Sequence, residues 1–165
     1  MTILLSTLNA RYAHASLGLR YLLANMGALQ EQTSLMEFVI GAKTVEVVER
    51  LLAKKPRIVG FGIYIWNVEE TTKVVAMLKR VAPEVTVVLG GPEVSYETNE
   101  QEIARLADYV VTGWGEAVGS HERKAAQVDW VVAKPFDTSQ IVEITREVFR
   151  RREGKFEVAS AIVAA

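Results

Sequence analysis

The stretch "IVGFGIYI", residues 58–65, decides the fold class, because it contains no charged residue. A strand with one solvent-exposed face has alternating apolar and polar side chains, whereas the sequence of a strand covered on both faces is nearly all apolar. Such strands occur mainly in parallel sheets with helices on both sides. Residues 58–65 are therefore predicted to form a central strand of a parallel sheet.

Similar short runs lie on both sides of this stretch. "ILLSTL" (3–8) and "SLMEFVI" (34–40) precede it, and "VTVVLGG" (85–91) and "DYVVTGWGE" (108–116) follow it. Stretches with helical spacing separate these runs, at residues 17–26, 44–55, 68–81 and 99–107, with Asn67 as the expected cap of the third helix. Regular alternation of strands and helices predicts a three-layer α/β sandwich, flavodoxin-like (Rossmann-like), with a mainly parallel five-stranded sheet in the order 2-1-3-4-5.

The length of 165 residues suits one domain. We expect a single domain over residues 1–150 and a C-terminal tail over 151–165. "VDWVVAKPFD" (128–137) is a sixth strand candidate, and a helix is predicted over residues 138–153. Either this last unit extends the sheet, or it replaces the fifth unit; the sequence leaves both arrangements open.

Composition excludes several kinds of chemistry. The chain has no cysteine, which excludes disulfides, thiolate zinc sites, a cysteine nucleophile and a cysteine-ligated iron–sulfur cluster in this chain. The net charge of -1 gives no general reason to expect nucleic acid or an acidic membrane as a partner. The first residues lack the basic start and long apolar run of a signal peptide or membrane span, so a cytoplasmic location is expected.

Four unusual segments follow the predicted strands. They are "NARYAHAS" (9–16), "YIWN" (64–67), "GGPEVS" (90–95) and "GWGE" (113–116). Open parallel sheets bind ligands outside the carboxyl ends of their strands, so these segments define the candidate site. A strand that ends in two glycines exposes bare backbone, which lets a flat or bulky ligand approach closely; a tight turn is the alternative explanation.

Common catalytic and nucleotide-binding motifs are missing from these segments. Neither G-x-G-x-x-G after the first strand nor a phosphate-binding G-x-x-x-x-G-K-[ST] is found, and there is no G-x-S-x-G. His14 has no second ligand at metal-binding spacing, and His121 lies in a charged stretch typical of a surface. We therefore predict no catalytic residue and no direct metal ligand.

Residues 1 to about 117 nevertheless resemble a known family. "LNARYAHASLGLRYL", "IVGFGIYIWN", "VVLGGPEVS" and "ADYVVTGWGE" are similar to segments of the N-terminal cobalamin-binding domain of cobalamin-dependent radical S-adenosylmethionine enzymes. The motifs occur in the same order and at the ends of the corresponding strands. The resemblance implies that cobalamin is the cofactor, with its corrin over the strand ends and its nucleotide tail beside the sheet near Gly90 and Gly91.

The same resemblance implies a set of cofactor-binding positions in the loops that follow the strands. They are Asn9, Ala10, Arg11, Tyr12, His14, Ser16, Leu17 and Gly18 after the first strand; Tyr64, Trp66 and Asn67 after the third; Gly90, Gly91, Pro92 and Glu93 after the fourth; and Gly113, Trp114, Gly115 and Glu116 after the fifth.

Two departures from related proteins shape the expected function. Related cobalamin domains carry Asp-x-His-x-x-Gly, where the His ligates cobalt; here Tyr12 replaces the Asp and Gly18 falls one residue late, so His14 is expected to pack near the corrin instead. The radical chemistry of the family needs a C-x-x-x-C-x-x-C motif in a following barrel domain. This chain is therefore interpreted as a cobalamin-binding module without catalysis of its own, whose partner would be a missing radical S-adenosylmethionine domain.

Residues 118–150 resemble another protein class. "VDWVVAKPFDTSQIVEITREVFRR" is similar to the last strand and helix of a response-regulator receiver domain, with Lys134 at the position of the conserved receiver lysine. A receiver also needs acidic residues after its first strand, and "ILLSTLNAR" has none. Two alternatives to the cobalamin module thus stay open: a truncated, composite or engineered scaffold without a ligand, and a receiver-like signalling module.

Overall fold

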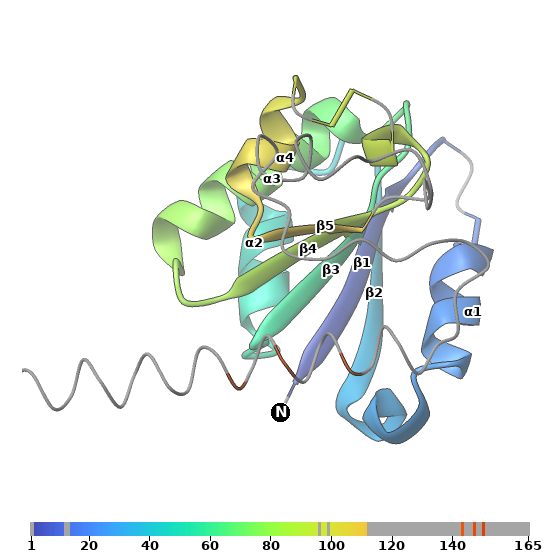
Figure 1. The fold of residues 1–165 in the computed structure, drawn as a ribbon. Helices are drawn as coiled ribbons and strands as arrows, with labels where there is room; N and C mark the ends of the chain where they lie inside the picture. The colour runs from blue at the N-terminus through green and yellow to red at the C-terminus, as the bar shows by residue number, and fades with distance from the viewer. Residues whose placement is uncertain are drawn as a thin grey trace, which may run out of the picture.

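The structure is a computed structural model that describes residues 2–11, 14–95, 97–98 and 100–111, together with Glu143, Glu147 and Arg150. Its strands form one parallel sheet in the order β2-β1-β3-β4-β5, which confirms the predicted fold (Figure 1). The strands are β1 (Ile3–Asn9), β2 (Thr33–Val39), β3 (Ile58–Gly62), β4 (Thr86–Gly90) and β5 (Tyr109–Val111).

The helices cover the two faces of the sheet unequally (Figure 1). On one side lie α1 (Leu17–Ala24) and the 3-10 helix η1 (Gly27–Gln32); this side is called the α1 face. The opposite side, called the α3 face, is covered by α2 (Thr44–Leu52), α3 (Val68–Val81) and α4 (Glu102–Leu106). A second 3-10 helix, η2 (Glu93–Ser95), follows β4. Neither 3-10 helix was predicted, because so short a turn has little periodicity to detect.

Most of the hydrophobic core lies on the α3 face. Alternation along the strands sends Leu4 and Leu8 of β1 to this side, where they are fully buried. Val74, Val75 and Leu78 on one side of α3 pack into the same core. The spacing of these α3 residues is that of one helical face, which explains why the bounds of α3 agree with those predicted.

Among the described residues, the α1 face has a much smaller core, in which Leu5 of β1 and Leu19 of α1 meet Ile58 of β3. Further along, this face carries glycines where the other face carries large apolar residues. In the parallel register of β3 and β4, Gly62 lies beside Gly90, at the carboxyl end of both strands.

Part of the sequence prediction lies outside the described residues. This applies to the sixth strand candidate, the segment 113–116, Tyr12, Lys134, His121 and the tail. Of the helix predicted over residues 138–153, the structure describes Glu143, Glu147 and Arg150, which are helical. Among the described residues, no helix combines the length and apolar character needed to cross a bilayer.

Candidate ligand site at the carboxyl end of the sheet

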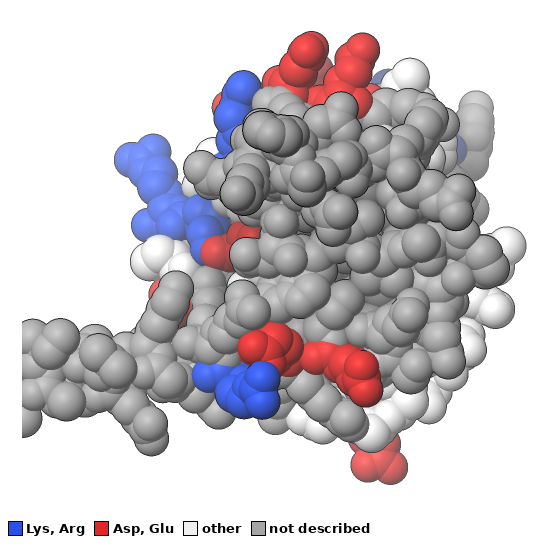
Figure 2. All heavy atoms as spheres, viewed as in Figure 1, with Lys and Arg blue, Asp and Glu red and all other residues white. Residues whose placement is uncertain are grey.

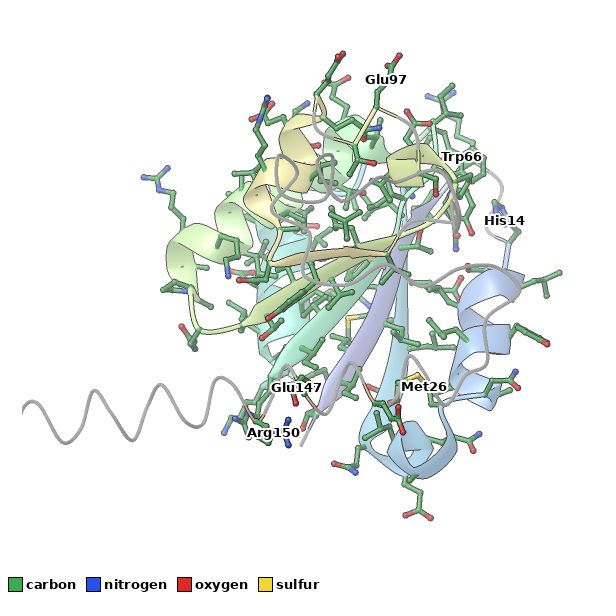
Figure 3. The ribbon with its side chains drawn as sticks, in the orientation of Figure 1. His14, Met26, Trp66, Glu97, Glu147 and Arg150 are labelled. Atoms are coloured by element: carbon green, nitrogen blue, oxygen red, sulfur yellow. The ribbon has the colours of Figure 1, made fainter. Side chains whose placement is uncertain are left out.

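The candidate site lies at the end of the sheet where β1, β3 and β4 finish. Figure 3 shows His14, which follows β1, and Trp66, which follows β3, at this end of the molecule, with Met26 at the opposite end. We call this end the rim. The loops after these three strands are thus brought together, as the strand-end rule predicts.

The loop after β1 is fixed by a carboxylate from β2. The side-chain amide of Asn9 donates to His14 O at 2.8 Å and to Glu37 Oε2 at 2.7 Å. The backbone N–H of Ser16 donates to the same Glu37 oxygen at 2.7 Å, and Arg20 Nη1 pairs with Glu37 Oε1. Partial burial raises the pKa of Glu37, but these hydrogen bonds and the Arg20 charge outweigh it, so the pKa lies below its usual value.

Ser16 has a second role as the N-cap of α1. Its Oγ accepts a hydrogen bond from Leu19 N at 3.4 Å, and its backbone is extended, as expected at a cap. Both Asn9 and Ser16 are buried. The buried polar atoms of Asn9 and Ser16 therefore anchor the two ends of the loop. Arg11 and His14, which lie between them in the chain, are exposed.

Asn67 holds the exit of β3 against β1. It stands at the N-cap position of α3 without a side-chain capping bond. Instead, its fully buried amide accepts from Tyr64 N at 2.9 Å and donates to Thr7 Oγ1 at 3.1 Å, Leu8 O at 3.0 Å and Gly62 O at 3.1 Å. Asn67 thus supports the rim from inside the protein.

Exposed apolar side chains form a ledge on the rim. The rings of Tyr64 and Trp66 stack with their centroids 4.6 Å apart and their planes 4° from parallel. Leu17, Ile65 and Trp66 are 78%, 77% and 45% exposed. A Cβ at Gly18 would lie 3.3 Å from Tyr64 Oη, so the start of α1 adjoins this aromatic pair. We call Leu17, Tyr64, Ile65 and Trp66 the rim ledge.

The two glycines at the end of β4 differ in what surrounds them. Gly91 has a φ of +118°, and a Cβ there would lie 2.3 Å from Ile63 O, so the turn itself requires glycine. At Gly90 the nearest atom to an added Cβ would be Val111 O, at 3.9 Å. Gly91 is thus explained by the protein's own backbone, whereas no side chain of the described residues comes within 4 Å of a Cβ at Gly90.

The remaining predicted positions after β4 belong to the same turn. Glu93 N donates to Ile63 O at 3.4 Å, and Ser95 Oγ donates to Gly91 O at 3.0 Å. Pro92 is exposed and Glu93 is half-buried. Ala10, after β1, is also half-buried. These residues line the rim without any arrangement that indicates acid–base chemistry.

The described residues of the rim carry charges of both signs, such as Arg11 and Glu93. Figure 2 shows side chains of both signs at the margins of the described part of this view. Within the described residues, no group of three or more His, Cys, Asp or Glu side chains could hold a metal ion. Among the described residues, the features that distinguish the rim are its exposed apolar side chains and Gly90, which no described side chain covers.

Comparison with solved structures finds similar chains, of which NtrX, with a TM-score above 0.5, shares the fold. A cobalamin-binding protein from Desulfitobacterium hafniense is 12% identical over 88% of this chain and 58% of that protein, with a TM-score of 0.47. NtrX from Brucella abortus is 17% identical over 97% of this chain and 29% of NtrX, with a TM-score of 0.55. The response regulator domain of Thermotoga maritima CheB is 17% identical over 76% of this chain and 88% of that domain, with a TM-score of 0.44. This chain therefore spans little more than half of the first protein and less than a third of NtrX.

Sequence comparison is more specific than these structural likenesses. No curated protein sequence matches the chain at a significant level. The family model of the B12 binding domain matches residues 4–121, a range that includes β2 to β5, all of β1 except its first residue, and the whole rim. The chain belongs to the B12 binding domain family.

Proposed function

We propose that this chain binds a cobalamin at the rim, with the corrin on the rim ledge and the nucleotide tail entering the α1 face past Gly90. One observation carries the proposal: exposed apolar side chains lie at the end of a sheet where a neighbouring strand ends in Gly90, which no side chain of the described residues covers. Membership of the B12 binding domain family supports the choice of ligand.

The ledge suits a corrin because a corrin is broad and largely apolar. Leu17 and Ile65 expose most of their surface on the same rim, where a broad apolar ligand could cover both. Covering a Leu or Ile side chain contributes about 1.5–3 kcal/mol. The stacked rings of Tyr64 and Trp66 add a flat, rigid surface that costs little entropy to order.

The proposed route of the nucleotide tail depends on which strand glycines are already covered by side chains of the protein. A Cβ at Gly60 would meet Leu5 Cδ2 at 3.0 Å, and a Cβ at Gly62 would meet Leu19 Cδ2 at 3.6 Å. The protein's own side chains thus occupy the space above both residues. Since Gly90 has no such cover among the described residues, the tail is proposed to pass along β4 and not along β3.

His14 is proposed to contact the margin of the corrin without ligating cobalt. Its backbone oxygen is tied to Asn9, and its side chain is exposed on the rim. When bound, the cofactor would supply the cobalt-centred chemistry, and the residues of this chain would hold and orient it.

The wider proposal concerns the protein to which this module contributes. The order of the rim motifs supports a cobalamin-binding part of a radical S-adenosylmethionine enzyme, with the catalytic cluster on another domain or chain. On this proposal the isolated module takes up cobalamin and turns over no substrate.

Equilibrium dialysis against hydroxocobalamin, read by corrin absorbance, tests the binding proposal. We expect uptake of one corrin per chain, a loss of about tenfold in affinity for Trp66→Ala, and no change for Val81→Ala. Val81 is a matched control because it is 60% exposed but lies at the other end of α3. Absence of uptake by the wild-type protein would favour the alternative of a scaffold without a ligand.

A further inference from the structure

We infer that Glu37 is a positioning residue: from β2, its carboxylate holds Asn9 and Ser16, the two ends of the loop after β1, and through Asn9 it holds the backbone of His14 on the rim. This inference rests on the proposed function, since the loop matters only if the rim binds cobalamin. Sequence reasoning gave Glu37 no role, because it lies in the middle of a predicted strand.

One carboxylate reaches both ends of the loop. Glu37 Oε2 accepts from Asn9 Nδ2, at the end of β1, and from Ser16 N, just before α1, each at 2.7 Å. Arg20, in the first turn of α1, binds the other carboxylate oxygen. The two ends of the loop are therefore held to a single point on β2, and the loop between them has a fixed span.

His14 is held through Asn9. The amide group that donates to Glu37 also donates to His14 O, so the position of His14 depends on the same arrangement. Without the carboxylate, Asn9 would lose the partner that orients its amide. The backbone oxygen of His14 would then lose a well-oriented donor, although nothing has been removed at His14 itself.

The environment of Glu37 makes these bonds strong. The side chain is 17% exposed, so water competes weakly for the carboxylate. Hydrogen bonds that involve an ionised group are shorter and stronger than neutral ones. The lowered pKa of Glu37 keeps the carboxylate charged near neutral pH, the form that can accept all three donors at once.

The rest of the fold does not depend on this carboxylate. β2 pairs with β1 along its whole length, and α1 is anchored by Leu19 in the small core of the α1 face. Loss of Glu37 should therefore loosen the loop and leave the sheet intact. A loop that must be ordered during binding lowers affinity, because the cost of ordering is subtracted from the binding energy.

The test compares Glu37→Gln with Glu49→Gln, a matched control on an exposed position of α2. Each variant is titrated with hydroxocobalamin, its melting temperature is recorded, and amide hydrogen exchange is followed at Ser16 and Val59. For Glu37→Gln we expect an affinity about tenfold lower, faster exchange at Ser16, and unchanged exchange at Val59 in β3. Glu49→Gln should match the wild type in every measurement.

Each outcome decides the inference. We call the contacts of Glu37 with Asn9, Ser16 and Arg20 the Glu37 clamp. Faster exchange at Ser16 with wild-type affinity would show that the clamp exists but does not affect ligand binding. Unchanged exchange at Ser16 would show that no clamp exists, and either result overturns the inference. If Glu37→Gln melts far below the wild type, Arg20→Gln is used instead, because it removes only one donor to the carboxylate. Arg20→Gln should weaken binding about threefold at an unchanged melting temperature. Unchanged affinity of this variant would overturn the inference. Wild-type protein that takes up no corrin overturns the proposed function itself, and the Ser16 exchange then shows separately whether the clamp exists.

Discussion

The two faces of the sheet use the same strands for different purposes. On the α3 face, Leu4, Leu8 and Phe61 meet α2 and α3 in a continuous apolar core. On the α1 face, the same strands present Thr7 and glycines toward the rim, and the apolar cluster of the described residues lies at the other end. Because side chains alternate along a strand, one sequence can give one face to stability and the other to a ligand.

The division also explains the features of the rim. A site for a bulky ligand needs unfilled space and backbone without side chains. Both reduce the apolar packing on the face of the sheet where the site lies. The polar atoms of Asn9, Glu37 and Asn67 fix the rim by hydrogen bonds where apolar packing is absent. The α3 face supplies most of the packing energy that maintains this arrangement.

Neighbouring leucines on β1 test the difference between the faces most strongly. Leu4→Ala should lower the free energy of unfolding by about 4 kcal/mol, because it leaves a cavity in the larger core, whereas Leu5→Ala should cost about 2 kcal/mol. Urea unfolding followed by circular dichroism measures both. Equal losses would show that the two faces contribute alike.

The paired glycines at the end of β4 give the next largest effect. Gly91→Ala should lower the free energy of unfolding by about 3 kcal/mol, since its φ is left-handed and its Cβ would collide with Ile63 O. Gly90→Ala should change stability by less than about 1 kcal/mol, and Gly90→Val should abolish cobalamin uptake. Thermal melts and dialysis separate the two roles, and a Gly90→Val protein that still binds corrin would contradict the proposed tail route.

The buried amide of Asn67 gives a smaller loss. Asn67→Ala removes four hydrogen bonds and leaves buried partners without them, so we expect a loss of about 2 kcal/mol in the free energy of unfolding. Chemical denaturation is the measurement, with Val81→Ala as a surface control. A loss below that of the control would mean that the rim is held by other contacts.

The smallest expected effect is the pH dependence contributed by Glu37. Its folded-state pKa is lowered, so its contribution to stability is present above the pKa of the unfolded chain and is lost as the pH falls through the folded value. Melting temperatures between pH 7 and roughly pH 3 should therefore fall less for Glu37→Gln than for the wild type. Parallel curves for the two proteins would show that the carboxylate gives no net stabilisation.

Sequence alone predicted the sheet order and the strand-end location of the site, because both follow from the alternation of apolar runs and helices. It did not predict the Glu37 clamp, which exists because the parallel register places β2 beside the end of β1. Nor could it separate Gly90 from Gly91, since the difference depends on where the backbone of Ile63 lies. Asn67 was expected to cap α3; it stands at the N-cap position, but its amide bonds to Thr7 and Leu8 instead of capping the helix, and its contact with a ligand stays a prediction.

The central claim is that cobalamin occupies the rim and the α1 face while the α3 face only maintains the fold. Amide chemical-shift mapping of the labelled protein with hydroxocobalamin tests it directly. The account predicts large changes at Leu17, Trp66 and Gly90, and small ones at Val48 and Val75. Changes concentrated on α2 and α3, or none at Gly90 when corrin is bound, would contradict it.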